Sequence, residues 1–215
     1  MNKSVPVWII LLILSTNIFA QSQPELFSKV DSLVKYITGS NFEQNSSFRE
    51  DLDLIDSLYY HSRKIADDRG EALLMLSMAA LPFQKFPIKA PLSGMEFGIP
   101  LPQGPNSLFE RKIKNLPSHF LFDSRGNFGD KDKLSHFFGN AYLTYTTGCF
   151  TITKFMGILV ELFEFNFKKN GEVNRRDMML NYLGGLFGLA LKKNNAATPS
   201  EFIKLYSLFY LRIYI

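Results

Sequence analysis

Polar side chains recur at helical spacing within otherwise apolar segments in the C-terminal part of the chain. They form three pairs whose members are three or four residues apart: Asp132 and His136, Glu161 and Glu164, and Asp177 and Asn181. Residues at these spacings lie on one face of a helix. If the three helices pack side by side, an imidazole, several carboxylates and an amide meet in one site.

This group of side chains has two functional interpretations. A divalent metal ion could bind through nitrogen and oxygen ligands, for which the candidates are Asp132, His136, Glu161 and Asp177. Alternatively, the site could carry out acid–base catalysis, with His136 oriented by Asp132 or Glu161. The candidate catalytic set is then Asp132, His136, Glu161, Asp177 and Asn181.

The structural interpretation is a buried hydrogen-bonded network that fixes the register of the helices. Buried carboxylates need partners, and Lys133, Arg175 or Arg176 could provide them. The spacing by itself favours this interpretation, because an Asp one helical turn from a His is common. The sequence contains no HExxH, no Gly-rich phosphate loop and no GxSxG motif. We expect His61 on the surface of a helix and His119 in a loop.

Four helices are predicted to position these side chains, over residues 130–147, 150–168, 174–192 and 199–212. Asn174 is a suitable cap for the third helix. The fourth begins with a capping box over residues 198–201, in which Pro199 takes the first helical position. Gly184 and Gly188 continue the stripe of Asp177 and Asn181. Each glycine costs about 1 kcal/mol of helix stability relative to alanine, so we expect another helix to approach closely there.

The N-terminal part has apolar residues at helical spacing over residues 25–38 and 47–67, and an almost entirely apolar segment over 70–80. We predict a helix for each. Six prolines then fall between residues 81 and 106, a spacing that excludes a long helix. This region predicts a long ordered loop with a short strand near residues 95–99, and loops of this length are often functional.

The predicted fold class is therefore all-α. It is a helical bundle with a long Pro/Gly-rich loop between the N-terminal and C-terminal helices. The predicted boundaries are a signal peptide over 1–20, N-terminal helices over 21–82, the loop over 83–129 and a helical core over 130–215.

The N-terminus has the three parts of a cleavable signal peptide in the right order. Lys3 supplies a positive charge, residues 5–14 are apolar apart from Pro6, and a more polar stretch ends at Ala20. The apolar run is shorter than the roughly 18 residues that a spanning helix needs, so we expect cleavage between Ala20 and Gln21. The single cysteine, Cys149, lies far from this point, so the usual lipid-attachment cysteine is missing.

The composition excludes some partners and leaves others open. The chain is 46% hydrophobic with 21 phenylalanines, which is enough for a sizeable core. The formal charge is only +4 and the basic residues are scattered, so we expect no nucleic-acid partner. The predicted helix over 150–168 carries Lys154, Glu161 and Glu164, and charges are costly inside a bilayer. A periplasmic location, or a peripheral position on a membrane surface, is therefore expected.

Three segments together resemble the VanZ-like family and related small bacterial envelope proteins. Residues 132–137 (DKLSHF) are similar to the family's DK-x-x-HF opening. Residues 157–164 (GILVELFE) and 177–188 (DMMLNYLGGLFG) resemble its G-x-x-x-E-x-x-Q/D and D-x-x-x-N-x-x-G-x-x-x-G segments. The resemblance covers about residues 130–192. It departs at Glu164, where Gln or Asp is usual, and many family members are integral membrane proteins.

The resemblance implies a role in the bacterial cell envelope and supports the polar cluster as a shared site. The leading hypothesis is a non-enzymatic envelope factor whose cluster organises the core or binds a ligand. A second is a metal-dependent or acid–base enzyme acting on an envelope lipid or peptidoglycan precursor. A third is an interaction module that uses the Pro-rich loop and the aromatic C-terminus, residues 206–214, against a membrane or partner.

Overall fold

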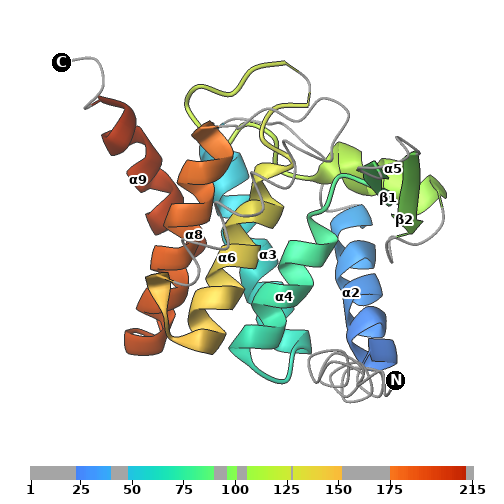
Figure 1. Ribbon diagram of the computed structural model, residues 1–215, viewed down its shortest axis with the longest axis horizontal. Coiled ribbons are helices and arrows are strands. Elements are labelled where there is room, and N and C mark those ends of the chain that lie inside the picture. The colour runs from blue at the N-terminus through green and yellow to red at the C-terminus, as the bar shows by residue number, and fades with distance from the viewer. Residues whose placement is uncertain are drawn as a thin grey trace, which may run out of the picture.

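The computed structural model describes residues 23–39, 48–89, 96–100, 106–126, 128–151 and 175–211. Figure 1 shows the arrangement of its elements. The N-terminal helices are α2 (Gln23–Thr38), α3 (Phe48–Ile65) and α4 (Arg69–Ala79). A hairpin of β1 (Lys85–Lys89) and β2 (Glu96–Pro100) and the helix α5 (Asn106–Asn115) follow. The C-terminal helices are α6 (Lys133–Thr147), α8 (Arg175–Lys193) and α9 (Pro199–Leu211).

The all-α character that the sequence predicts is confirmed in the described residues, where the hairpin is the one addition. The predicted helices over 25–38, 47–67, 70–80 and 199–212 match α2, α3, α4 and α9 closely. The helix predicted over 130–147 corresponds to α6, which begins three residues later than predicted because residues 130–132 form a turn. The signal peptide, Asn174 and nearly all of the predicted helix over 150–168 lie outside the described residues.

The prediction of one long loop over 83–129 is wrong in two places. β1 pairs antiparallel with β2, with Lys85 opposite Pro100 and Lys89 opposite Glu96. The prolines exclude a helix, but a two-stranded sheet consists of edge strands, where proline is tolerated. The predicted strand near 95–99 is confirmed as β2. Helix α5 was missed because it is short and its most buried residues, Lys112 and Asn115, are polar.

The capping box predicted for the last helix is confirmed. The Thr198 amide donates to the Glu201 carboxylate at 3.0 Å, and Pro199 is the first residue of α9. Asp56 of α3 adds a tertiary contact, because it accepts from the Ser200 amide at 2.9 Å and from the Ser200 hydroxyl at 2.6 Å. The start of α9 is therefore attached to α3.

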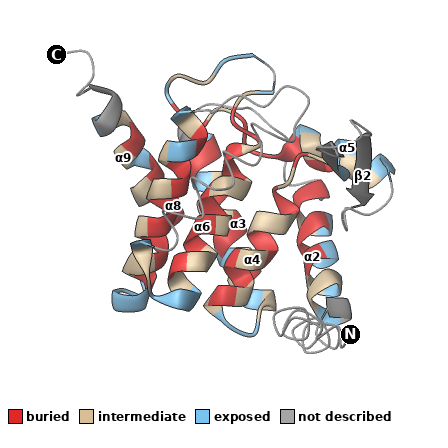
Figure 2. Cartoon of the chain, viewed as in Figure 1, coloured by how far each residue is buried: buried red, intermediate tan, exposed pale blue. Residues whose placement is uncertain are grey.

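Buried side chains from both ends of the chain form one core. In Figure 1, α4 lies between α2 on one side and α6 on the other, and α8 and α9 continue the row. Leu33 of α2, Met75 of α4, Phe137 of α6 and Phe187 of α8 all belong to the same buried cluster. Figure 2 shows that buried positions concentrate where the helices face one another, with exposed positions at the helix ends and in the loops. No helix in the described part of the chain is both long enough and apolar enough to cross a membrane.

Candidate functional site

The site is built on the contact between α6 and α8, which is the most extensive helix pair of the described residues. A Cβ added to Gly184 would lie 2.0 Å from the Phe137 carbonyl oxygen, and one added to Gly188 would lie 2.2 Å from that of Ala141. The two backbones therefore touch, and only glycine fits at either position. The close approach predicted from these two glycines is confirmed.

Close packing brings three charged side chains together at the N-terminal ends of both helices. Lys133 Nζ lies 2.9 Å from Asp132 Oδ2 and 2.6 Å from Asp177 Oδ1. The side chains of Lys133 and Asp177 are 4% and 7% exposed, whereas that of Asp132 is 25% exposed. Burial by itself would lower the pKa of Lys133, but the carboxylates of Asp177 and Asp132 outweigh it and raise the pKa. Lys133 is therefore a charged ammonium that pairs with both carboxylates and offsets one of their two negative charges.

His136 lies one helical turn further along α6 and contacts α8 through both ring nitrogens. Its Nδ1 is 3.2 Å from Asn181 Oδ1, and its Nε2 is 4.0 Å from Asp177 Oδ2. Asn140 Nδ2 also donates to Asn181 Oδ1, at 2.6 Å, and to the His136 carbonyl oxygen at 2.9 Å. Because Asn181 Oδ1 is an acceptor, His136 Nδ1 carries a proton. The network thus fixes the orientation of the imidazole and the tautomer of its neutral form.

The polar stripe of α6 is longer than the sequence analysis proposed. Asn140 and Thr144 continue the four-residue spacing of Asp132 and His136, and both are buried against α8. Among the described residues, Asp132 Oδ1, Asn140 Oδ1 and Thr144 Oγ1 are buried without a hydrogen-bond partner. Sequence reasoning missed Asn140 and Thr144, although their spacing was the available signal.

Four of the five predicted site residues meet at this contact: Asp132, His136, Asp177 and Asn181. The fifth, Glu161, lies outside the described residues together with Glu164. Within the described ranges, no three His, Cys, Asp or Glu side chains are grouped so that they could hold a metal ion. The position between Asp132 and Asp177 is taken by the ammonium of Lys133.

Lys133, Arg175 and Arg176 were proposed as partners for the carboxylates of the cluster. Lys133 is such a partner, whereas Arg176 pairs with carboxylates outside the cluster. Arg176 contacts Asp130, which is fully buried, and lies 3.3 Å from Asp123 Oδ1. Tyr206 of α9 donates to Asp123 Oδ2 at 3.1 Å. Arg176 therefore attaches the loop over residues 121–130 to α8 and α9. Arg175 is exposed.

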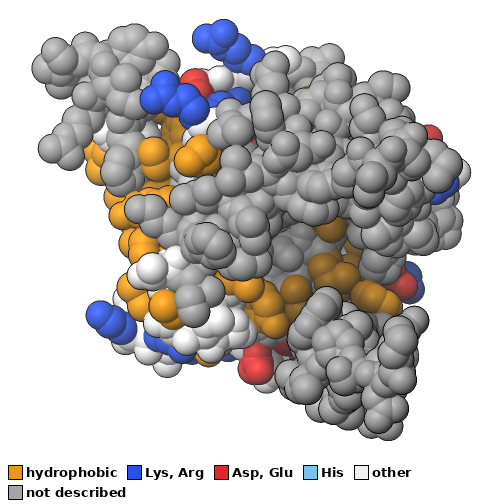
Figure 3. Space-filling view, viewed as in Figure 1, with side chains coloured by type: hydrophobic (Ala, Val, Ile, Leu, Met, Phe, Trp, Pro, Cys, Tyr) orange, Lys and Arg blue, Asp and Glu red, His pale blue; other side chains and the backbone are white. Residues whose placement is uncertain are grey.

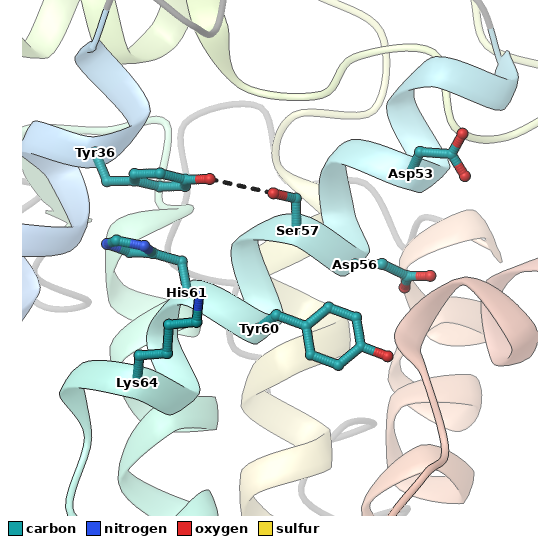
Figure 4. A pocket seen from close by; sticks show the side chains of 7 residues that line it. All are labelled: Tyr36, Asp53, Asp56, Ser57, Tyr60, His61 and Lys64. Atoms are coloured by element: carbon teal, nitrogen blue, oxygen red, sulfur yellow. Dashed lines mark hydrogen bonds between the residues drawn. The ribbon is translucent and has the colours of Figure 1, made fainter.

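A separate cleft of about 310 Å³ runs along α3 next to α2. Figure 4 shows its lining side chains, which are Tyr36, Asp53, Asp56, Ser57, Tyr60, His61 and Lys64. His61 stacks on Tyr36 with the ring centroids 3.6 Å apart, so it is half-buried where it lines this surface cleft. Burial and, secondarily, Lys64 lower the pKa of His61. Asp56 is engaged in capping α9.

His119 lies in a loop, as predicted. Its Nδ1 is 2.9 Å from Ser118 Oγ. Asp51 of α3 accepts from both backbone amides, at 2.8 Å for Ser118 and 2.5 Å for His119. These bonds attach the loop to the core.

The comparisons with protein-family models, curated proteins and solved structures gave no match to this chain.

Proposed function

We propose that this protein is an exported component of the bacterial cell envelope that acts by binding and not by catalysis. The observation that carries the proposal is the position of Lys133, within 2.9 Å of Asp132 and 2.6 Å of Asp177. Its ammonium pairs with the two carboxylates that a metal ion or a general base would need. The network is then best suited to holding α6 against α8. We expect the binding function to reside on other surfaces of the protein.

The proposed location in the cell envelope rests on residues 1–20, which resemble a signal peptide, and on the resemblance of residues 130–192 to VanZ-like proteins. The test is expression of the full chain in a bacterial host, followed by cell fractionation and N-terminal sequencing. We expect a processed protein that begins at Gln21 in the periplasmic or membrane-surface fraction. A cytoplasmic protein that retains Met1 would contradict export.

The proposed role of the network is tested by His136→Ala and Asp132→Asn, measured as the free energy of unfolding in urea. We expect a loss of about 1 to 3 kcal/mol for each, because His136→Ala removes a hydrogen-bond partner of Asn181 and Asp132→Asn weakens the ion pair with Lys133. Asp53→Asn on the exposed side of α3 is the matched control and should change stability by less than about 0.5 kcal/mol. Stoichiometric metal in the purified protein would count against the proposal.

The second candidate is acid–base catalysis on an envelope lipid or peptidoglycan precursor. The observation that favours it is the fixed imidazole of His136, which donates from Nδ1 to Asn181 and places Nε2 4.0 Å from Asp177. A histidine held in one tautomer by a neighbour is the usual arrangement of a general base. Turnover of such a precursor that is lost in His136→Gln but kept in His61→Gln would replace our proposal with this one.

A further inference from the structure

Exposed hydrophobic side chains gather at one end of the molecule. The large hydrophobic side chains that are exposed among the described residues are Tyr60, Phe122, Phe128, Met178 and Leu208, at 39% to 61% exposure. Tyr60 lines the cleft on α3. Arg176 contacts Asp123 and Asp130, and Asp123 accepts a hydrogen bond from Tyr206. Each of the other four exposed hydrophobic residues lies within two residues of a member of this group along the sequence.

The contacts of Arg176 hold the segments that carry these four side chains at one end of the molecule. Arg176 pairs with Asp123 and Asp130, and Tyr206 donates to Asp123. The rings of Phe122 and Tyr206 lie 5.7 Å apart. The loop over 121–130, the first turn of α8 and the C-terminal half of α9 are therefore fixed together. In Figure 1 they meet at the upper end of the molecule.

Each of the four hydrophobic side chains has an exposed cation three or four residues away. Arg125 lies midway between Phe122 and Phe128 in the loop. Arg175 precedes Met178 by three residues on α8, and Lys204 precedes Leu208 by four on α9, spacings that place each pair on one helix face. Figure 3 shows Lys and Arg side chains projecting at the upper end, above hydrophobic side chains along α8 and α9.

The two carboxylates at this end are paired with a cation. Asp130 is fully buried, and the side chain of Asp123 is 18% exposed. Both contact the guanidinium of Arg176. The exposed charge of the loop tip and the first turn of α8 is therefore carried by Arg125 and Arg175.

We propose that this end of the molecule docks on an anionic lipid bilayer. We call it the Arg176 surface and define it by Phe122, Arg125, Phe128, Arg175, Met178 and Leu208. Apolar side chains that alternate with cations suit the boundary between acyl chains and phosphate headgroups. Arginine binds phosphate in a bidentate manner. The three cations beside the apolar side chains favour an anionic surface as the partner. The inference rests on the proposed envelope location.

The sequence supplies a spectroscopic test. The single tryptophan is Trp8, within the segment that we expect to be removed, so the processed protein has none. The variant Phe128→Trp then reports on the Arg176 surface, and Tyr60→Trp on α3 is its matched control. With vesicles containing about 30% phosphatidylglycerol, we expect a blue shift of emission for F128W and none for Y60W. Vesicles of phosphatidylcholine should give a much weaker response.

Charge reversal tests the cations. Arg125→Glu combined with Arg175→Glu should weaken binding to the phosphatidylglycerol vesicles about tenfold or more, because each basic residue near an anionic surface contributes about 1 kcal/mol. The matched control is Lys35→Glu with Lys64→Glu, two exposed lysines of α2 and α3, with less than about a twofold change. Raising the salt from about 0.1 M to about 0.5 M should release the wild-type protein.

The outcomes separate this inference from the proposed function. N-terminal sequencing of each preparation shows whether residues 1–20 were removed, which tests export alone. Processed protein that does not bind the anionic vesicles, or that binds them equally well after the double Arg reversal, overturns the docking surface and leaves export standing. Concentration-dependent dimerisation that buries the F128W indole without vesicles overturns it too, in favour of a second copy as partner.

Discussion

At the scale of single residues, Lys133 decides what the polar cluster is. Asp132, His136, Asp177 and Asn181 are the residue types of a metal or acid–base site, and they do converge. The ammonium of Lys133 lies between the two carboxylates, with its side chain 4% exposed. Buried charges of this kind are stable only as pairs, so the cluster depends on this one cation.

We predict that Lys133→Met destabilises the fold by about 3 to 5 kcal/mol, because it leaves the buried carboxylate of Asp177 unpaired. The measurement is urea unfolding at neutral pH. Lys35→Met, at an exposed position of α2, is the control and should stay within about 0.5 kcal/mol of wild type. The double variant Lys133→Met/Asp177→Leu should recover part of the loss. A single variant as stable as wild type would show that the pair contributes nothing.

Lys112 of α5 is a second buried cation, in a different situation. It is fully buried, and its Nζ donates to the Leu81 carbonyl oxygen at 2.7 Å and lies 4.9 Å from the centre of the Phe109 ring. Burial lowers the pKa of Lys112 to about 7. Between this value and the ordinary 10.5, the unfolded chain binds a proton that the folded protein does not.

Wild-type stability should therefore rise as the pH increases from about 7 to about 10, by roughly 2 to 4 kcal/mol from this residue. Lys112→Met removes the titrating group, so its stability should be nearly independent of pH in that window and higher than wild type at pH 7. Urea unfolding at several pH values measures both. A wild-type curve and a variant curve that run parallel would contradict the assigned pKa.

At the scale of elements, two glycines of α8 determine how closely it packs on α6. Their added Cβ atoms would meet the carbonyl oxygens of Phe137 and Ala141 at 2.0 and 2.2 Å, closer than any real Cβ contact. This contact brings Asp177 and Asn181 to His136. The sequence predicted the close approach because glycine destabilises a helix interior. Two glycines at this spacing therefore indicate that another helix occupies the space a side chain would fill.

We predict that Gly184→Ala and Gly188→Ala each destabilise the protein by at least about 1 to 3 kcal/mol, because the overpacking outweighs the gain in helix propensity. Gly139→Ala on α6 is the matched control. Its added Cβ would be 3.9 Å from Ser77, which is an ordinary contact, so it should stabilise the protein by up to about 1 kcal/mol. Thermal unfolding of the three variants distinguishes them. Equal effects at Gly139 and Gly184 would contradict the close backbone contact.

At the scale of the whole molecule, the N-terminal and C-terminal helices share one core. Met75 of α4 is fully buried, and α4 packs against α2, α3 and α6. The predicted boundaries at residues 82 and 129 separate elements of this core. The Lys29 ammonium of α2 adds a surface link to α4, since it lies 3.0 Å from Glu71 and 2.8 Å from Asp67.

We predict that α3 and α9 unfold together. Tyr60→Trp and Leu208→Trp place one reporter on each helix, and their urea midpoints should coincide. Met75→Ala should lower the free energy of unfolding by about 2 to 5 kcal/mol. Both reporters should show the same decrease in the urea midpoint. Two separate transitions, or a shift confined to the α3 reporter, would mean that the two parts fold independently.

The sequence by itself determined where most helices lie, because apolar periodicity, the capping box over 198–201 and the helix-breaking prolines are local signals. It also determined which polar residues share a helix face. It did not reveal α5, whose buried groups are Lys112 and Asn115, or the hairpin, because a tertiary environment holds both. Only the tertiary structure decided that Lys133 pairs with Asp132 and Asp177 while Arg176 pairs with Asp123 and Asp130. Helical spacing gives the face of a residue, but the choice between nearby cations depends on how the helices and the loop over 121–130 pack.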